Sequence, residues 1–314
     1  MEFGRVSPKE LSKINFRLPI EPNLNFKVLR GKRLKKTIAC LGCAKWGRKE
    51  WLGKIYPLKT KEKNFLEEYV KHYNSIEMNA THYKIYEPET ILKWANKAEG
   101  LDFIFCPKMA KAITHYGNLY NKQELLDRYF EGITAFGEHL GPIFIQVSDK
   151  FGPKRKEELF EFLKTLPKDH TFFLEVRHPD WFLPEHSTIL FNTLKRLKIG
   201  AVITDTSGRR DCCHMHLTIP KAFIRFVGNS LHKSDYKRCD EWVHRIKYWI
   251  DNGLKEVYFF MHMHDEAKSP ELTIYLVNRL NEVCGLNLIV PVFEKKIRKL
   301  TSLKKDLKSK LKKK

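Results

Sequence analysis

Apolar residues along most of the chain follow two alternating patterns. From residue 37 onward, short apolar runs alternate with longer segments in which apolar residues recur every three or four positions. The first pattern is typical of buried strands and the second of amphipathic helices. Eight runs are predicted as strands, at residues 37–43, 75–81, 103–109, 142–147, 171–177, 200–205, 222–227 and 256–262. Seven segments are predicted as helices, at residues 61–72, 89–97, 122–139, 154–166, 184–197, 236–251 and 270–284.

This alternation of strands and helices indicates βαβ units and a parallel sheet. Over a span of this length it predicts an α/β fold, a closed (β/α)8 TIM barrel with basic N- and C-terminal extensions. An open doubly wound sheet is the main alternative, but no G-x-G-x-x-G sequence follows the first strand. Residues 206–221 are too short and broken for a helix, so we expect a loop there. We divide the chain into a basic extension (1–36), a barrel domain (37–285) and a lysine-rich amphipathic tail (286–314).

Positive charge is concentrated at the two ends of the chain. The 314 residues carry a formal charge of +21. Residues 1–36 contain ten Lys/Arg and three Glu, and residues 295–314 contain eleven Lys/Arg and one Asp, so the body between them is close to neutral. Such ends are suited to binding nucleic acid without sequence preference. Solvated tails that keep the protein in solution are an equally good interpretation.

The tail itself has a helical pattern. Within residues 293–314, Ile and Leu recur at spacings of three and four and form one narrow apolar stripe among lysines. A helix of this kind suits an anionic membrane surface or nucleic acid. The alternative, which we favour, is a helix that docks on the body through its leucines.

Composition and cysteine use favour a globular cytoplasmic protein. Hydrophobic residues make up 42% of the chain, and no apolar run approaches the roughly 20 residues of a membrane-spanning helix. The amino terminus has no signal-peptide pattern. The seven cysteines are an odd number in a chain of this length, so we expect reduced, structural thiols rather than a disulfide framework.

The stretch 171–182 joins an apolar run to charged residues. Because side chains on a strand alternate between its faces, Glu175 and Arg177 share one side. His178 and Pro179 then end the strand, since a proline cannot donate to the ladder. An acid and a base at the carboxyl end of a buried strand favour a functional site. A buried ion pair that only holds the fold together is the alternative.

Several other strands end in the same way, and in a barrel these ends gather at one mouth. The polar residues that we expect there are Glu77, Asn79, Cys106, Lys108, Gln146, Glu175, Arg177, Asp205, Arg225, His262 and His264. Acids, cations and imidazoles in one place indicate a binding or catalytic pocket. Inner-layer ion pairs also occur in barrels without any catalytic role, so charge balance alone does not decide the matter.

The first chemistry that fits this set is acid–base catalysis on a small anionic (phosphorylated) or sugar-like substrate. Lys108, Arg177 and Arg225 would hold the substrate, because arginine suits bidentate recognition of phosphate or carboxylate. A carboxylate would act as general base and a histidine as acid. The catalytic candidates are Glu175, Glu77, Asp205 and His262.

The second chemistry is that of a divalent metal held by His262, His264, Glu175 and Asp205. A His-x-His sequence on a strand puts both rings on one face, which is a usable ligand spacing. Two ligands do not make a site, so the sequence requires no cofactor, and a divalent metal is an alternative.

The motifs of the chain resemble those of the YecE-like family, also called the domain of unknown function 72. Six motifs occur in the order of that family: WGRKEWLGKIYP (46–57), IEMNATHYKIYE (76–87), FIFCPKMAKAITH (103–115), LGPIFIQVSDKF (140–151), LEVRHPDWF (174–182) and FIRFVGN (223–229). The resemblance covers about residues 37–285 and implies a TIM barrel. It implies no reaction, because the activity of the family is not established.

The resemblance also implies which polar positions are shared with the family. Those positions are Glu77, Asn79, Lys108, His115, Gln146, Glu175, Arg177, His178, Asp205 and Arg225. The remaining substrate-binding candidates are Asn79, Gln146, His115, His178 and Trp46. Trp46 is suited to stacking on a sugar or base, but also to packing a loop. At the eighth strand, where the family tends to carry asparagines, this chain has His262 and His264, which marks a subgroup with a different substrate or a metal.

The sequence therefore predicts an uncharacterised protein of this family that acts as an enzyme, a hydrolase or an isomerase, on a small molecule. Binding of nucleic acid through the basic ends and a metal-dependent reaction are the alternatives.

Overall fold

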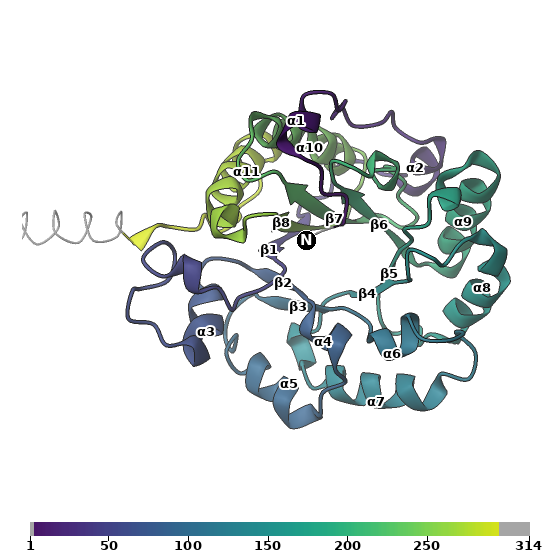
Figure 1. The fold of residues 1–314 in the computed structure, drawn as a ribbon, viewed down its shortest axis with the longest axis horizontal. Helices are drawn as coiled ribbons and strands as arrows, with labels where there is room; N and C mark the ends of the chain where they lie inside the picture. The colour runs from purple at the N-terminus through teal and green to yellow at the C-terminus, as the bar shows by residue number, and fades with distance from the viewer. Residues whose placement is uncertain (1–2, 295–314) are drawn as a thin grey trace, which may run out of the picture.

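The computed structural model describes residues 3–294, and its strands match the apolar runs of the sequence. In chain order the strands are β1 (Ile38–Cys43), β2 (Ser75–Met78), β3 (Ile104–Pro107), β4 (Ile143–Gln146), β5 (Phe172–Glu175), β6 (Gly200–Asp205), β7 (Lys221–Gly228) and β8 (Glu256–Met263). They lie in chain order around a common centre, with the longer helices outside them (Figure 1).

The predicted closed eight-stranded barrel is wrong. Hydrogen bonds join six strands into one curled parallel sheet in the order β1-β8-β7-β6-β5-β4, and β2 and β3 form a separate two-stranded sheet. All strand pairs within the described residues are parallel, as the βαβ pattern predicts. The ladder is therefore interrupted on both sides of the β2–β3 pair.

Side chains replace the backbone ladder between β1 and β2. The Asn74 amide accepts a hydrogen bond from the Leu41 N–H at 2.8 Å and donates one to the Ala39 carbonyl at 2.8 Å. The Tyr69 hydroxyl accepts from the Cys43 N–H at 2.7 Å and donates to the Ser75 carbonyl at 2.9 Å. Buried backbone groups must be paired, and these two side chains pair them without a continuous strand-to-strand ladder.

Between β3 and β4 the structure forms only isolated bridges. Phe105 pairs with Leu140 and Lys108 with Phe144, on either side of Pro107. Pro107 ends β3 and has no N–H to donate, so a continuous ladder cannot form at this position.

The longer helices outside the strands also follow the predicted segments, whereas the short helices α4 and α6 lie outside them. They are α3 (Phe65–Tyr69), α4 (Ala80–Tyr83), α5 (Pro88–Ala95), α6 (Lys111–Thr114), α7 (Gln123–Thr134), α8 (Lys156–Thr165), α9 (Pro184–Leu197), α10 (Lys233–Asp251) and α11 (Ser269–Cys284). Prolines in the first turn begin α5, α9 and α11, where a missing N–H costs nothing. Gly285 closes α11 in the left-handed conformation. The connection at 206–221 contains only the short 3-10 turn Arg210–Cys212, as expected.

Apolar side chains form two cores. One lies between the strands and the helices, and a smaller one lies on the inner face of the strands. The buried members of the inner core are Cys40, Cys106, Phe144, Phe173, Val202, Phe223, Tyr258 and Phe260. This aromatic layer fills the space beneath the carboxyl ends of the strands, and it forms the floor of the region where the polar strand ends meet.

The amino-terminal extension packs on this body. It contains α1 (Pro8–Leu11) and α2 (Asn23–Val28), and Figure 1 shows it in purple, running from the centre of the molecule to α1 near α10. The Leu18 N–H donates to Glu241 at 2.7 Å, and the Trp249 indole donates to Glu21 at 2.8 Å. The division into three regions at residues 36 and 285 stays a prediction.

Two further predictions concern the ends and the cysteines. Within the described part of the chain, no helix is both long and apolar enough to cross a membrane. The helix predicted at 293–314 lies almost entirely outside the described residues. All seven cysteines are buried free thiols.

Candidate active site at the carboxyl ends of the strands

Arg225 on β7 lies at the centre of a buried cluster of charges. Its guanidinium donates two hydrogen bonds to Glu77 on β2, at 2.7 and 2.8 Å, and a third to Glu175 on β5 at 2.7 Å. Arg225 and both carboxylates are almost completely buried. One guanidinium thus ties the two-stranded sheet to the six-stranded sheet across the inner face of the strands.

Arg177 extends this cluster toward solvent. Its Nε donates to Glu175 at 3.0 Å, and Thr204 on β6 donates to the same carboxylate oxygen at 2.9 Å. The Arg177 side chain is 12% exposed. Within residues 3–294, its terminal nitrogens make no hydrogen bond to the protein. Glu175 and Arg177 therefore share one face, as strand periodicity predicts, and Arg177 keeps donors available.

Lys108 is a buried amine without an acidic partner. It follows β3, is 6% exposed, and its Nζ donates to the amide oxygen of Gln146 at 2.8 Å. Nζ also lies 5.5 Å from the centre of the Phe144 ring. No carboxylate of the described chain lies within ion-pair distance of this amine. Burial, followed by the nearby Arg225, lowers the pKa of Lys108 to about 7.

The two carboxylates of the cluster remain ionised. Burial alone would raise their pKa values. At Glu77 this effect is outweighed by Arg225 and His262, and at Glu175 it is outweighed by Arg177 and Arg225. The pKa of Glu77 falls well below its usual value, and that of Glu175 falls to about 2. Neither is a good proton acceptor near neutral pH, which argues against the general-base role that the sequence suggests for them.

Asn79 and His262 complete the surroundings of Glu77. The Asn79 amide donates to Glu77 at 2.8 Å, and His262 Nε2 on β8 lies 2.9 Å from the other carboxylate oxygen. Both residues were expected at the mouth, and both lie there.

A pair of histidines borders this cluster beside Lys108. The rings of His82 on α4 and His115 after α6 lie 4.9 Å apart, and His82 Nδ1 lies 2.8 Å from the Met109 carbonyl oxygen. Burial, followed by Lys108, lowers the pKa of His82 to about 3 and that of His115 to about 4. Both rings are therefore neutral at physiological pH. His82 is absent from the sequence-based candidates, although it stands three residues after Asn79.

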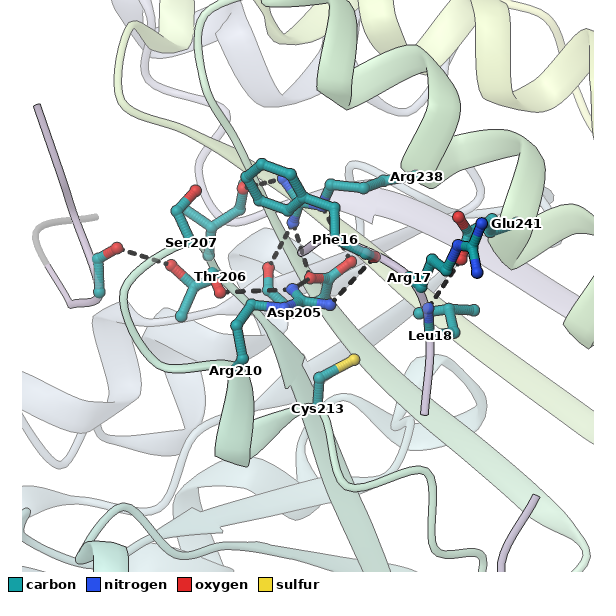
Figure 2. Close-up of polar contacts among 12 residues, drawn as sticks. Phe16, Arg17, Leu18, Asp205, Thr206, Ser207, Arg210, Cys213, Arg238 and Glu241 are labelled. Carbon is teal, nitrogen blue, oxygen red and sulfur yellow. Dashed lines mark hydrogen bonds and ion pairs between the residues drawn. The ribbon is translucent and has the colours of Figure 1, made fainter. Parts of the chain in front are cut away.

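The prediction that Asp205 joins this cluster is wrong. Thr204 points inward to Glu175, so its neighbour Asp205 points to the opposite face of β6, toward α10. There Asp205 is held by Arg210 and Arg238 (Figure 2). The Trp242 indole also donates to it, at 2.8 Å.

Asp205 also helps to fix the amino-terminal extension. The Phe16 ring lies over Arg238 and Arg210, and its carbonyl accepts a hydrogen bond from Arg210 at 3.3 Å (Figure 2). Burial opposes ionisation of Asp205, but Arg238 and Arg210 outweigh it and hold the pKa at about 2. These contacts assign Asp205 to the packing of the fold.

The four residues proposed as metal ligands do not assemble. His262 faces Glu77 and Asp205 lies behind β6, so neither joins Glu175 around a common point. Within the described ranges, no three His, Cys, Asp or Glu side chains are grouped so that they could hold a metal ion.

Two other candidates lie beside the cluster rather than in it. His178 accepts a hydrogen bond from the Asp180 N–H and so caps the 3-10 turn Pro179–Phe182. Trp46 packs edge-on against Trp94 at 5.7 Å, and its carbonyl accepts a hydrogen bond from Tyr56. For Trp46 these contacts favour the interpretation as a loop-packing residue.

The amino-terminal extension reaches the edge of the cluster. The Phe3 ring lies 4.0 Å from the guanidinium carbon of Arg177 and 5.3 Å from that of Arg209. The Gly4 carbonyl accepts a hydrogen bond from the Gly208 N–H at 2.8 Å. Among the described residues of the cluster, Arg177 is the only arginine that is partly exposed, and Phe3 covers one face of its guanidinium.

Comparison with known proteins places the chain in a family. A family model described as a protein of unknown function, DUF72, matches residues 40–291. The chain belongs to the DUF72 family. It is 28% identical over 226 residues to the UPF0759 protein YecE of Escherichia coli K12, which covers 66% of this chain and 82% of that protein.

Solved structures of the family share the fold. A DUF72 protein from Enterococcus faecalis V583 aligns with a TM-score of 0.61 at 17% identity, over 81% of this chain and 98% of the other. One from Thermotoga maritima MSB8 aligns with a TM-score of 0.56 at 19% identity, over 79% of this chain and 100% of the other. The resemblance seen in the sequence motifs is thus confirmed, and the family remains one without an assigned reaction.

Proposed function

We propose that this DUF72 protein is an enzyme that binds a small anionic substrate at the carboxyl ends of the strands and acts on it by acid–base chemistry. The observation that carries the proposal is an excess of buried donors. Glu77 and Glu175 are already neutralised by Arg225 and Arg177, and the Lys108 amine adds a further donor without a carboxylate. An incoming anion would supply the missing acceptors.

The contacts suggest a role for each group. Arg177 retains terminal N–H donors at the more exposed side of the cluster, so it is the residue to bind a phosphate or carboxylate. Lys108 has a pKa of about 7, which lets it both accept and return a proton near neutral pH. His115 is a neutral imidazole beside it and is suited to relaying that proton. Sugar-like substrates fit the same donors less well than anions do.

The proposal is tested by measuring binding of inorganic phosphate, sugar phosphates and 2-oxo acids by calorimetry. We expect Arg177→Ala to weaken binding by about 10- to 100-fold, the cost of losing a charge-assisted hydrogen-bonded pair. Arg279→Ala is the control, because Arg279 pairs with Asp240 at the surface at 3.0 Å and touches no residue of the cluster. Binding that is equally strong in both variants would refute the proposal.

A second candidate function is non-specific binding of nucleic acid through the basic ends. It is supported by the concentration of Lys and Arg in residues 1–36 and 295–314. Titration with RNA and DNA at several salt concentrations, with and without residues 295–314, separates the two functions. If the affinity for nucleic acid depends on neither the salt concentration nor the truncation, binding through the basic ends is excluded.

A further inference from the structure

We infer that Lys108 is a covalent catalyst whose ε-amine condenses with the carbonyl carbon of a small aldehyde or ketone that also carries a carboxylate or phosphate. This inference rests on the proposed function, and it narrows the substrate class from anions in general to anionic carbonyl compounds.

The first argument is the environment of the amine. A buried lysine ordinarily needs a carboxylate, and two carboxylates lie nearby in the cluster. Both are committed to guanidiniums, and the hydrogen bond of Lys108 goes instead to the neutral amide of Gln146. Apolar and cationic neighbours surround the amine, with the Phe144 ring beneath both Lys108 and Arg225. This arrangement favours the neutral amine, which is the nucleophilic form.

The second argument is orientation. A neutral amine has two N–H bonds and one lone pair. Because the amide oxygen of Gln146 accepts one N–H at 2.8 Å, the lone pair of Nζ points elsewhere. Gln146 lies two residues beyond Phe144 on β4, so both side chains belong to the same inner face of the strand. The hydrogen bond therefore restrains rotation of the amine and leaves its lone pair free to attack.

The third argument is the anion-binding group beside the amine. Arg177 and Arg225 both pair with Glu175, at 3.0 and 2.7 Å, and Arg225 lies over the same Phe144 ring as Lys108. Arg177 also contributes to the low pKa of Lys108. A carbonyl compound whose carboxylate or phosphate binds Arg177 would bring its carbonyl carbon into the region of Lys108. In such a compound the anion anchors the substrate and the carbonyl reacts.

The chemistry balances without a cofactor. The lone pair of Nζ forms the C–N bond as the carbonyl π pair moves to oxygen, which gives a carbinolamine once the oxygen gains a proton. The C–O bond then breaks and an imine remains. The water that leaves contains the carbonyl oxygen and both hydrogens of the original amine. In this scheme the neutral His115 imidazole would take a proton from nitrogen and return one to the departing hydroxyl.

The test uses the full-length protein with glyoxylate, pyruvate or glyceraldehyde 3-phosphate and sodium cyanoborohydride as reductant. Reduction adds two hydrogens to the imine and makes the adduct permanent. We expect one adduct per chain, mapped by peptide mass spectrometry to Lys108, and a rate that rises as pH increases through about 7. Acetone and propionaldehyde, which lack an anion, should react far more slowly at this position. Labelling that is spread over exposed lysines and spares Lys108, in both the wild type and the Phe3→Ala variant, overturns the inference.

Gln146→Glu provides a near-isosteric test that leaves Lys108 in place. The new carboxylate would pair with the amine and raise its pKa, so the pH at which trapping is half-maximal should move upward by at least about one unit. Lys84→Met, which removes a surface lysine, should leave the pH profile unchanged. An unchanged profile in Gln146→Glu contradicts the inference.

The outcomes separate this inference from the proposed function. Anion binding that is lost in Arg177→Ala, with no imine trapped in any variant, sustains the proposed function and removes the covalent role of Lys108. An adduct at Lys108 that forms equally well with uncharged carbonyls and in Arg177→Ala removes the anionic substrate and with it the proposed function.

Discussion

The carboxyl ends of the strands contain two buried ion clusters, one on the inner face around Arg225 and one between β6 and α10 around Asp205. Both place carboxylates between arginines, and both are shielded from water. In the outer cluster, Asp205 accepts from Arg210, Arg238 and Trp242, so its acceptors are fully used. The inner cluster has a cationic excess and an amine without a counter-ion.

The difference shows how buried charge serves structure in one place and chemistry in another. A closed set of ion pairs has nothing left to offer a ligand, and its removal is felt only in stability. A set with spare donors carries a cost in stability that a bound anion relieves. Four changes test this contrast.

The largest effect is expected from removing the central arginine of either cluster. Arg225→Met and Arg238→Met each leave buried carboxylates without their main counter-charge, which costs about 3–5 kcal/mol of unfolding free energy. Urea denaturation measures this. Arg279→Met is the control, because Arg279 pairs with Asp240 at the surface, where solvent screens the ion pair and its loss has little effect on stability. If Arg238→Met costs no more than the control, the outer cluster is not structural.

Next in size is the effect of Lys108→Met, which we expect to stabilise the protein near neutral pH. The pKa of Lys108 is about 7 in the folded protein and about 10.4 in the unfolded chain, so the unfolded state binds more protons between these values. Stability of the wild type therefore rises with pH across this window, with an upper limit of about 1.4 kcal/mol per unit of pKa difference. Denaturation curves from pH 6 to 10 should show this rise in the wild type and lose it in Lys108→Met. A variant with the same pH dependence as the wild type contradicts the assignment.

A smaller effect is expected on the pKa of Lys108, which should respond to charge in the inner cluster but not in the outer one. Glu175 helps to hold a proton on Lys108, so Glu175→Gln should lower the pKa of that amine. Asp205→Asn removes an equally buried carboxylate from the outer cluster and should leave the pKa of Lys108 unchanged. NMR titration of isotope-labelled lysine side chains measures the pKa of Lys108 directly. Equal shifts in the two variants would mean that the clusters are not electrically separate.

The smallest effect on stability is expected from Phe3→Ala. A ring over a partly exposed guanidinium contributes about 0.5–1 kcal/mol, and Phe3 lies 4.0 Å from Arg177. The same change uncovers Arg177, so phosphate should associate faster even though the fold is slightly weaker. Stopped-flow binding against Phe26→Ala, an exposed ring elsewhere in the extension, gives the comparison. Equal association rates in the two variants would show that Phe3 does not restrict access.

The sequence was sufficient for most of the local structure and for much of the inner cluster. Apolar runs located every strand to within a few residues, and β6 and α9 agree with their predicted bounds. Strand periodicity correctly paired Glu175 with Arg177. The same periodicity puts Thr204 and Asp205 on opposite faces of β6, but only the contact of Thr204 with Glu175 shows which of the two faces inward.

Closure of the barrel could not be predicted in this way. Whether the ladder continues past β2 and β3 depends on how the Asn74 amide and the Tyr69 hydroxyl substitute for backbone partners, and on the missing N–H of Pro107. These are tertiary contacts with no periodic signal. The missed residue His82 lies on the short helix α4, where a three-residue offset from Asn79 has no strand alternation to reveal it.

The position of Phe3 has a practical consequence for handling the protein. A fusion tag joined before Met1 would be attached two residues from the ring that lies over Arg177. An acidic purification handle would then sit close to Arg177, at the edge of the cationic cluster, and would compete with added anions. Assays of this protein should therefore use a carboxyl-terminal tag or a chain without residues added before Met1.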